Sequence, residues 1–264
     1  MVVSILLQNK EELGKMERNE KRIRYPLPDV IRGTVLINAI AYHGIWDLVY
    51  LFGMDWEWYT TRGAYWWQQA ICWTFILLSG FCWSMGRRRL RRGVTVFGAG
   101  LLVMAVTLIF MPQDRVLFGV LTLIGSGMLL WIPLEKGLVH VSTPAGLAGS
   151  VLLFLLTRNV ADGYLGFEGW NLWPLPEDWY ANLFTTYLGL PGDTFYSTDY
   201  FGLFPWLFLF GAGYFLYRLL AEKKKLSVLG RPHFAPLEFV GRHSLGIYLL
   251  HQPVLYGILT LLLG

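Results

Sequence analysis

Long apolar segments separated by short polar loops are the feature that most limits how this chain can fold. A helix needs about 20 predominantly apolar residues to cross a bilayer, and most of these segments approach that length. Of the 264 residues, 55% are hydrophobic and only 15% are charged, more apolar surface than a soluble domain can bury. The segments comprise residues 31–52, 65–85, 94–111, 116–132, 147–156, 201–220 and 244–263. We therefore expect an all-α, polytopic integral membrane bundle of about seven transmembrane spans.

The same pattern divides the chain into a tail and one membrane domain. Residues 1–24 are largely polar and of mixed charge, so we expect a cytoplasmic N-terminal tail there and an integral membrane domain over residues 25–264. One long loop, residues 158–199, is rich in aromatic, acidic, Gly and Pro residues. Within it, residues 179–190 fit an interfacial or re-entrant helix.

The distribution of charge predicts the orientation. Basic residues cluster in the N-terminal tail, in Arg87–Arg92 after the second segment and in Lys223–Lys225 after the sixth, whereas the alternate loops are acidic or neutral. Cytoplasmic loops carry an excess of Lys and Arg. We expect a multi-pass protein of the cell membrane, with its N-terminus cytoplasmic and its C-terminus extracytoplasmic. The net charge of +4 then reports topology rather than nucleic-acid binding, although Arg87–Arg92 could also attract a phosphorylated ligand.

Three polar side chains share one face of the first segment. Eleven helical positions bring His43 back to within roughly 20° of Arg32 and roughly 16 Å deeper, and Asp47 follows one turn later. Ionisable groups at that depth usually face a bundle interior or a wet cavity. Imidazole can act as a general base, and Asp47 could orient the ring of His43. A histidine that only bonds a neighbouring helix is the structural alternative.

The last segment repeats this arrangement. Arg242, His243 and Ser244 mark its cytoplasmic edge, and His251 lies roughly 13 Å deeper than Arg242. We therefore expect His43 and His251 to face one cavity, and Arg32 and Arg242 to flank one cytoplasmic opening. Pro253 leaves a simpler role open, in which His251 bonds backbone that the proline has freed.

Residues beyond the outer ends of the helices could hold a second substrate. Asp199 begins Asp199-Tyr-Phe-Gly-Leu-Phe-Pro-Trp206, where it could cap a helix or hold an amine or hydroxyl at the outer mouth of the bundle. Trp170, Trp173 and Trp179 of the long loop could stack on sugars or cover a cleft. We interpret the two cysteines as packing residues and expect no metal.

The order of these motifs resembles a known family. Arg32 and His43 match the R-x10-H pattern of the membrane acyltransferase-3 group. The whole set, from residue 25 onwards, is similar to the heparan-alpha-glucosaminide N-acetyltransferase catalytic-domain-like family of bacterial membrane proteins. The matching stretches are Asp29-Val-Ile-Arg32-Gly33, His43, Asp47, Phe75-Ile-Leu-Leu-Ser79-Gly80, Phe118-Gly119-Val-Leu121, Asp199 to Trp206 and Gly241-Arg242-His243-Ser244 to His251-Gln252-Pro253. Thr122 stands where we would expect a histidine.

The resemblance implies a membrane enzyme that moves an acyl group from cytoplasmic acyl-CoA, with acetyl-CoA as co-substrate, to an amine or hydroxyl of an extracytoplasmic sugar or glycolipid. It implies catalytic roles for His43, Asp47 and His251. It implies donor binding by Arg32, Arg242, His243 and Ser244, because arginine pairs with phosphate through two parallel bonds. Asp199 and Trp206 would bind the acceptor. Membrane lipids are expected partners, nucleic acid is not, and a homodimer is left open.

Two readings other than an enzyme fit parts of the pattern. In a proton-coupled transporter or lipid-handling protein, the buried histidines would relay protons or bind substrate. Transporters more often show broken helices in two related halves, which are not evident here. A purely structural membrane subunit would not need the polar face of the first segment. Within the enzyme reading, His43 could be the base or could carry the acyl group transiently.

Overall fold

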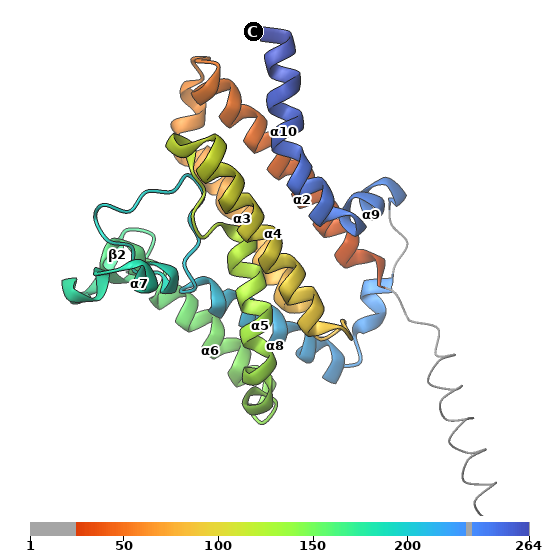
Figure 1. The fold of residues 1–264 in the computed structure, drawn as a ribbon. Helices are drawn as coiled ribbons and strands as arrows, with labels where there is room; N and C mark the ends of the chain where they lie inside the picture. The colour runs from red at the N-terminus through yellow and green to blue at the C-terminus, as the bar shows by residue number, and fades with distance from the viewer. Residues whose placement is uncertain (1–24, 231–233, 264) are drawn as a thin grey trace, which may run out of the picture.

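The computed structural model describes residues 25–230 and 234–263, and the predicted tail, residues 1–24, lies outside them. The described chain is mostly helical (Figure 1). Its long helices are α2 (Pro26–Trp46), α3 (Arg62–Phe81), α4 (Arg89–Phe110), α5 (Val120–Leu138), α6 (Thr143–Leu156), α8 (Trp206–Glu222) and α10 (Ser244–Leu263). Its shorter elements are η1 (Asp47–Leu51), η2 (Glu57–Thr60), η3 (Pro112–Asp114), η4 (Val160–Asp162), β1 (Tyr164–Phe167), β2 (Trp170–Pro174), η5 (Glu177–Tyr180), α7 (Leu183–Leu188), η6 (Leu226–Gly230) and α9 (Ala235–Arg242).

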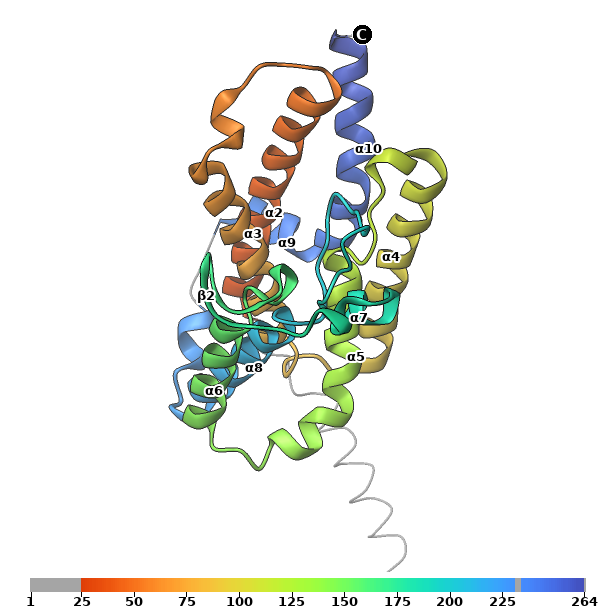
Figure 2. The same cartoon turned by 90° about the vertical axis from the view of Figure 1, so that its left-hand side faces the viewer.

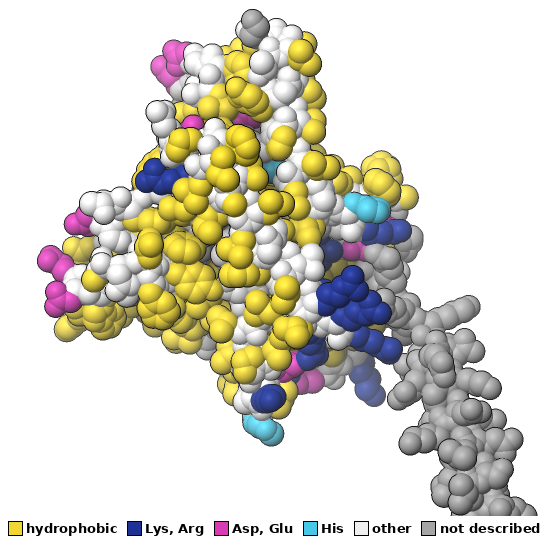
Figure 3. All heavy atoms as spheres, viewed as in Figure 1, with side chains coloured by type: hydrophobic (Ala, Val, Ile, Leu, Met, Phe, Trp, Pro, Cys, Tyr) yellow, Lys and Arg dark blue, Asp and Glu magenta, His cyan; other side chains and the backbone are white. Residues whose placement is uncertain are grey.

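A long helix occupies each of the seven apolar segments. In the described residues, three are long and apolar enough to cross a membrane, namely α2 with its extension η1, α4 and α10. Hydrophobic side chains cover much of the outer surface, whereas Lys and Arg gather by the start of α4 (Figure 3). This agrees with a helical membrane protein, and the full count of seven spans stays a prediction.

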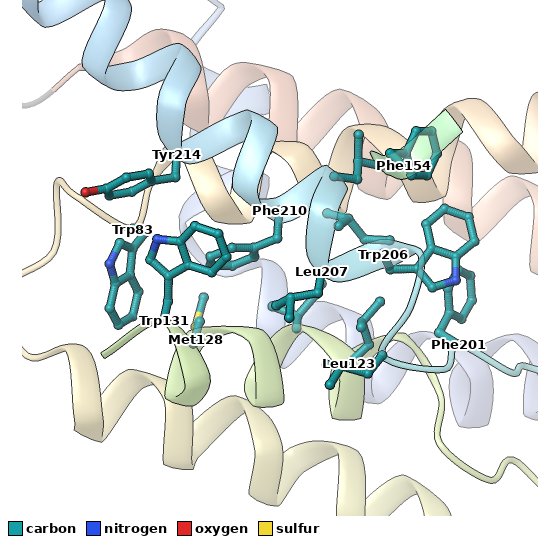
Figure 4. Close-up of a cluster of buried hydrophobic side chains, with 14 of the residues drawn as sticks. Trp83, Leu123, Met128, Trp131, Phe154, Phe201, Trp206, Leu207, Phe210 and Tyr214 are labelled. Atoms are coloured by element: carbon teal, nitrogen blue, oxygen red, sulfur yellow. The ribbon is translucent and has the colours of Figure 1, made fainter. Parts of the chain in front are cut away.

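Small residues let α3 and α8 pack closely. A β-carbon on Gly80 would lie 1.9 Å from the carbonyl oxygen of Phe210, and one on Gly213 would lie 2.0 Å from that of Leu77. Any larger side chain would force the two backbones apart. The largest hydrophobic core cluster then fills the space between α5 and α8, where aromatic rings dominate (Figure 4).

The first and last parts of the chain lie side by side. Helix α9 packs along α2, and α10 contacts α2, η1, α4 and α9. Figure 2 shows α2 and α3 on one side and α4 and α10 on the other, with the loop before α8 between them. Part of the stretch between the basic residues Lys223–Lys225 and Arg242 thus forms helix α9, which packs against α2.

The long loop also holds more structure than expected. A two-stranded antiparallel hairpin, β1–β2, forms in it, and its turn residues Glu168 (φ +47°) and Gly169 (φ +88°) both have positive φ. Two such residues make the tight turn that suits the twist of paired strands. The helix proposed for residues 179–190 is resolved into η5 and the six-residue α7, whose first turn is capped by the side chain of Asn182.

Candidate active site

His43 of α2 and His251 of α10 lie opposite each other inside the bundle. Their ring centroids are 5.0 Å apart, with the planes inclined at 57°. Gly44 follows His43 on α2, and a β-carbon at Gly44 would lie 3.7 Å from the side chain of Leu255 on α10. The two deep histidines therefore lie together, as expected, while the cavity that we expected them to face stays a prediction. Two imidazoles at this spacing can act on one small group held between or beside them.

The hydrogen bond of His251 determines which of its nitrogens carries a proton. Its Nδ1 contacts the backbone oxygen of Tyr248. A carbonyl oxygen can only accept, so Nδ1 must carry the hydrogen and neutral His251 keeps its lone pair on Nε2. That Nε2 is buried and finds no hydrogen-bond partner among residues 25–230 and 234–263. The oxygen that His251 contacts is that of Tyr248 and not that of Leu249, which is the carbonyl that Pro253 leaves without an amide donor. The contact leaves Nε2 able to act as a base.

Asp47 does not orient His43 in the way that the sequence suggested. Its side chain is fully buried, and its Oδ1 accepts a hydrogen bond from the Nε2 amide of Gln252 across the α2–α10 contact. The described hydrogen bonds include none between the side chains of Asp47 and His43. A buried carboxylate needs a donor, and the amide opposite supplies one while the ring of His43 turns toward His251. The π-helical turn η1 begins at Asp47 and changes the helical register beyond it.

Arg32 and Arg242 meet at the other end of α2, where they share one carboxylate. Arg32 Nη1 lies 3.2 Å from Asp29 Oδ1, and Arg242 Nε lies 3.9 Å from Asp29 Oδ2. Arg242 also pairs with Glu238 at 2.6 Å. The two arginines therefore lie together, as expected, while the cytoplasmic opening that we expected them to flank stays a prediction. Two guanidinium groups from different helices can hold a phosphate that a single one would not position.

Two glycines, each next to one of these arginines, allow this approach. A β-carbon on Gly33 would lie 2.1 Å from the carbonyl oxygen of Leu237, and one on Gly241 would lie 1.8 Å from that of Asp29. Only glycine permits backbones to come so close. The glycines therefore fix the distance between α2 and α9, and with it the distance between the two arginines.

A third arginine from the basic run joins this end of the bundle. The Arg92 Nη1 atom donates to the backbone oxygen of Cys82 at 3.5 Å, and Arg32 Nη2 donates to Sγ of the same cysteine at 3.3 Å. Arg92 therefore faces the arginine pair rather than bulk water. His243, by contrast, is exposed, and its Nδ1 contacts the backbone oxygen of Phe239 at 2.9 Å. Ser244 begins α10 beside it.

Asp199 and Trp206 line a cavity of about 150 Å³. The loop before α8 supplies most of its wall, and α3 supplies Gln68 and Gln69. Both residues that the sequence assigned to the acceptor thus reach one cavity. A second, smaller cavity of about 10 Å³ is lined by Asp199, Thr122 and Tyr248. Tyr248 is three residues before His251, and their ring centroids are 5.0 Å apart, so the Asp199 wall connects to the histidine pair.

Arg158, which sequence analysis missed, organises the cavity of about 150 Å³. Its Nε lies 2.8 Å from Glu168 Oε1 in the hairpin turn. Its Nη2 donates to Gln69 Oε1 at 3.0 Å and to the Tyr65 hydroxyl at 3.1 Å. Its guanidinium carbon lies 4.9 Å from the centre of the Trp206 ring. Arg158 is the only basic residue between residues 158 and 199, a signal that could have identified it.

Asp199 is a carboxyl group with altered acidity. Burial raises its pKa to about 6, and the backbone N–H of Val120, 3.4 Å from Oδ2, lowers the pKa in part. A charged form in a low-dielectric setting is costly, which is the physical cause of the rise. Near neutral pH Asp199 is still mainly ionised, and it can accept a hydrogen bond from an amine or hydroxyl group in the cavity.

Comparison with known proteins agrees with this arrangement. A family model described as heparan-alpha-glucosaminide N-acetyltransferase, catalytic, matches residues 24–253. Searches of curated proteins and of solved structures each find no match. The matched range takes in both histidines, the arginine pair and the cavity lined by Asp199.

Proposed function

Since the chain belongs to the family of heparan-alpha-glucosaminide N-acetyltransferase catalytic domains, we propose that it moves an acetyl group from cytoplasmic acetyl-CoA to an extracytoplasmic acceptor. The acceptor supplies an amine or hydroxyl and is a sugar or glycolipid. One observation carries this proposal above the others. The facing rings of His43 and His251 lie toward one end of α2, and an arginine pair lies at its other end. Tyr248 adjoins both His251 and Asp199, which lines a polar cavity.

We assign the donor to the arginine end. Arg32 and Arg242 bind phosphate groups of CoA, and Arg92 adds a third positive charge beside them. Guanidinium groups suit this task because they pair with phosphate in a bidentate manner. Ser244 and His243 border the same end through the start of α10. The thioester then points along α2 toward His43, roughly 16 Å away at the rise of an α-helix.

We assign the acceptor to the cavity of about 150 Å³ that Asp199 and Trp206 line. The Asp199 carboxylate accepts a hydrogen bond from the sugar's reacting amine or hydroxyl group. Trp206 offers a ring, although Arg158 already covers part of it. Tyr248 adjoins both Asp199 and His251, and it leads from the cavity to the histidines.

The chemistry follows from the protonation of the two rings. Nε2 of His251 takes the proton from the acceptor's N–H or O–H as that nitrogen or oxygen bonds to the thioester carbon. His43 donates an N–H to the thioester oxygen, on which negative charge develops. The C–S bond then breaks, and the imidazolium of His251 returns its proton to the departing thiolate of CoA. Asp47 is a positioning residue, because its hydrogen bond holds Gln252 next to His251.

Direct measurement of transfer tests this proposal. Labelled acetyl-CoA and an amino-sugar glycoside are supplied together to the protein in nanodiscs. General base catalysis contributes about 10²–10⁴-fold, so we expect His251→Ala to lower kcat by that order. We expect His43→Ala to lower kcat by about 10²–10³-fold through loss of an oxyanion donor. His140→Ala changes an exposed histidine of the α5–α6 turn and should leave the rate unchanged. Full activity in both His251→Ala and His43→Ala would refute the catalytic assignment.

Two alternatives predict different results in the same preparation. If His43 carries the acetyl group, incubation with labelled acetyl-CoA alone should leave label on the wild type and none on His43→Ala. If the chain is a proton-coupled transporter, acetyl-CoA should not bind, and substrate uptake into liposomes should follow a proton gradient.

We also propose that the seven long helices are seven spans of the cell membrane, with the N-terminus cytoplasmic and the C-terminus outside. The arginines by the start of α4 and the lysines after α8 support this orientation, because cytoplasmic loops carry excess positive charge.

A further inference from the structure

An aromatic surface stands out on the long loop. We call it the aromatic hairpin, and it consists of the exposed apolar side chains of β2, η5 and α7. They are Trp170 (81% exposed), Leu172 (64%), Trp173 (70%), Trp179 (50%), Leu183 (65%) and Phe184 (68%). Large exposed apolar side chains gathered on one loop in this way mark a binding or membrane-contacting surface.

The position of the aromatic hairpin identifies what covers it. In both views β2 and α7 lie partway along the bundle, short of the outer ends of α2, α4 and α10 (Figures 1 and 2). Helix α6, which leads into the hairpin, has 14 residues and is therefore about 21 Å long. A span shorter than the hydrocarbon core of about 30 Å is accommodated by local thinning of the bilayer, which brings the hairpin to the outer boundary. The outer half of α6 also exposes apolar side chains, among them Leu152 and Leu155. The lipid-facing surface of α6 thus continues into the aromatic hairpin.

The depth of the hairpin follows from its backbone. A two-stranded sheet has free edges, and open edges are not tolerated in the hydrocarbon core because their N–H and C=O groups would lack partners. Tryptophan side chains are enriched at the level of the lipid headgroups, where one end of the ring is wet. The aromatic hairpin therefore lies at the outer membrane–water boundary.

The same hairpin forms part of the cavity wall. Arg158 follows α6 directly, lines the cavity and pairs with Glu168 in the hairpin turn. Tyr65 of α3 donates to the other oxygen of Glu168 at 2.5 Å. These contacts fix the hairpin to the bundle beside the cavity that holds Asp199. A molecule bound there lies at the depth of lipid headgroups.

We propose that the acceptor is a saccharide carried on a membrane lipid, with its terminal sugar in the Asp199 cavity and its lipid chain along the aromatic hairpin. This inference rests on the proposed function. A cavity of about 150 Å³ is smaller than the about 300–1,000 Å³ of pockets for drug-sized ligands. It therefore takes one sugar ring, and the remaining binding surface comes from the lipid.

Two forms of one amino sugar test this inference, its methyl glycoside and its glycoside on a diacylglycerol. Both are supplied to the full chain in nanodiscs with labelled acetyl-CoA. Partition into the bilayer would by itself lower the bulk KM of the lipid form, so its concentration is expressed as mole fraction of lipid and compared between variants. We expect Trp170→Ser with Trp173→Ser to raise the KM for the lipid form about tenfold, as expected when apolar contact is lost. The matched control Phe110→Ser changes a side chain that is 75% exposed at the outer end of α4, and it should have the wild-type KM.

A second measurement reports the position of the hairpin without using activity. A cysteine at Leu172 carries an environment-sensitive fluorophore, and a cysteine at the exposed Glu57 serves as the control. We expect lipid-borne nitroxide to quench the label at residue 172 and aqueous iodide to quench the label at residue 57.

The outcomes separate the two proposals. If acetyl-CoA binds but neither glycoside is acetylated, the proposed function fails. If both glycosides are acetylated while the Trp170 and Trp173 variant keeps the wild-type KM for the lipid form, the lipid-linked acceptor is overturned and the proposed function stands. Quenching of the label at residue 172 by iodide alone would also overturn the lipid-linked acceptor.

Discussion

The side-chain amide of Gln252 donates a hydrogen bond to the buried carboxylate of Asp47 at 2.5 Å, next to the histidine pair. It joins the last turn of α2 to α10 at the level where the reacting groups are proposed to meet. Because the Asp47 side chain is inaccessible to water, its carboxylate cannot replace this bond with one to solvent. The pair therefore fixes the register of α2 against α10.

Loss of this hydrogen bond should destabilise the protein. Gln252→Ala leaves the Asp47 carboxylate buried without its donor, and we expect the free energy of unfolding to fall by about 1–3 kcal/mol. Denaturant or thermal unfolding in detergent measures this change. Thr260→Ala, which alters an exposed threonine of the same helix, serves as the control. A Gln252→Ala protein as stable as that control would show that the bond contributes nothing.

The glycines between the arginines should control donor binding. Gly33→Ala and Gly241→Ala push α2 and α9 apart, since overpacking of a close contact costs about 1–3 kcal/mol. We expect acetyl-CoA binding to weaken by about tenfold or more in each, although no arginine is altered. Gly246→Ala adds a β-carbon that meets nothing within 4 Å and should bind as the wild type does. Equal dissociation constants for all three variants, measured calorimetrically, would contradict the assignment of the donor to this end.

The raised pKa of Asp199 predicts how activity depends on pH. Its carboxylate loses charge as the pH falls through about 6, and the ionised fraction drops about fivefold between pH 6 and pH 5. We expect the KM for the acceptor to rise by about that factor over this interval. Asp199→Asn should have a high KM that no longer varies with pH there. A wild-type KM that is flat from pH 7 to pH 5 would argue against a role for the carboxylate.

The same shift has a consequence for stability. A carboxyl group whose pKa is higher in the folded state binds its proton more tightly there, so it disfavours folding once it is ionised. Its penalty should grow as the pH rises from about 4 to 6 and remain at higher pH. Asp199→Asn should accordingly raise the unfolding midpoint at pH 7 relative to wild type and change it little at pH 4. A variant that is less stable than wild type at pH 7 would mean that the hydrogen bond from Val120 stabilises the ionised carboxylate by more than burial destabilises it.

Membrane orientation is checked by labelling from one side. A cysteine at Asp193, which is exposed in the loop before α8, should react with an impermeant maleimide added to intact cells. A cysteine at Arg87, which is exposed before α4, should react only after permeabilisation. The reverse pattern would invert the donor and acceptor sides.

The parts of this structure that depend on local pattern were predictable, and those that depend on tertiary partners were not. Apolar runs located the long helices, and helical spacing placed Arg32 and Arg242, and His43 and His251, at matching depths. The partner of Asp47 was missed because Gln252 competes for it across a helix contact, which no spacing rule reveals. Arg158 was missed for the same reason, since its partners Tyr65, Gln69 and Glu168 are distant in sequence and its own segment reads as loop.

Asp29 has a consequence for the unliganded protein. Arginines from two helices converge on it at the edge of an apolar bundle, where two bare cations would repel one another and resist leaving water. The carboxylates of Asp29 and Glu238 together balance the charges of Arg32 and Arg242 and act as resident counterions in the empty site. On the proposed function, a phosphate of CoA displaces these carboxylates from the two arginines when it binds. When CoA leaves, the carboxylates pair with the arginines again, so the empty site needs no ion from solution.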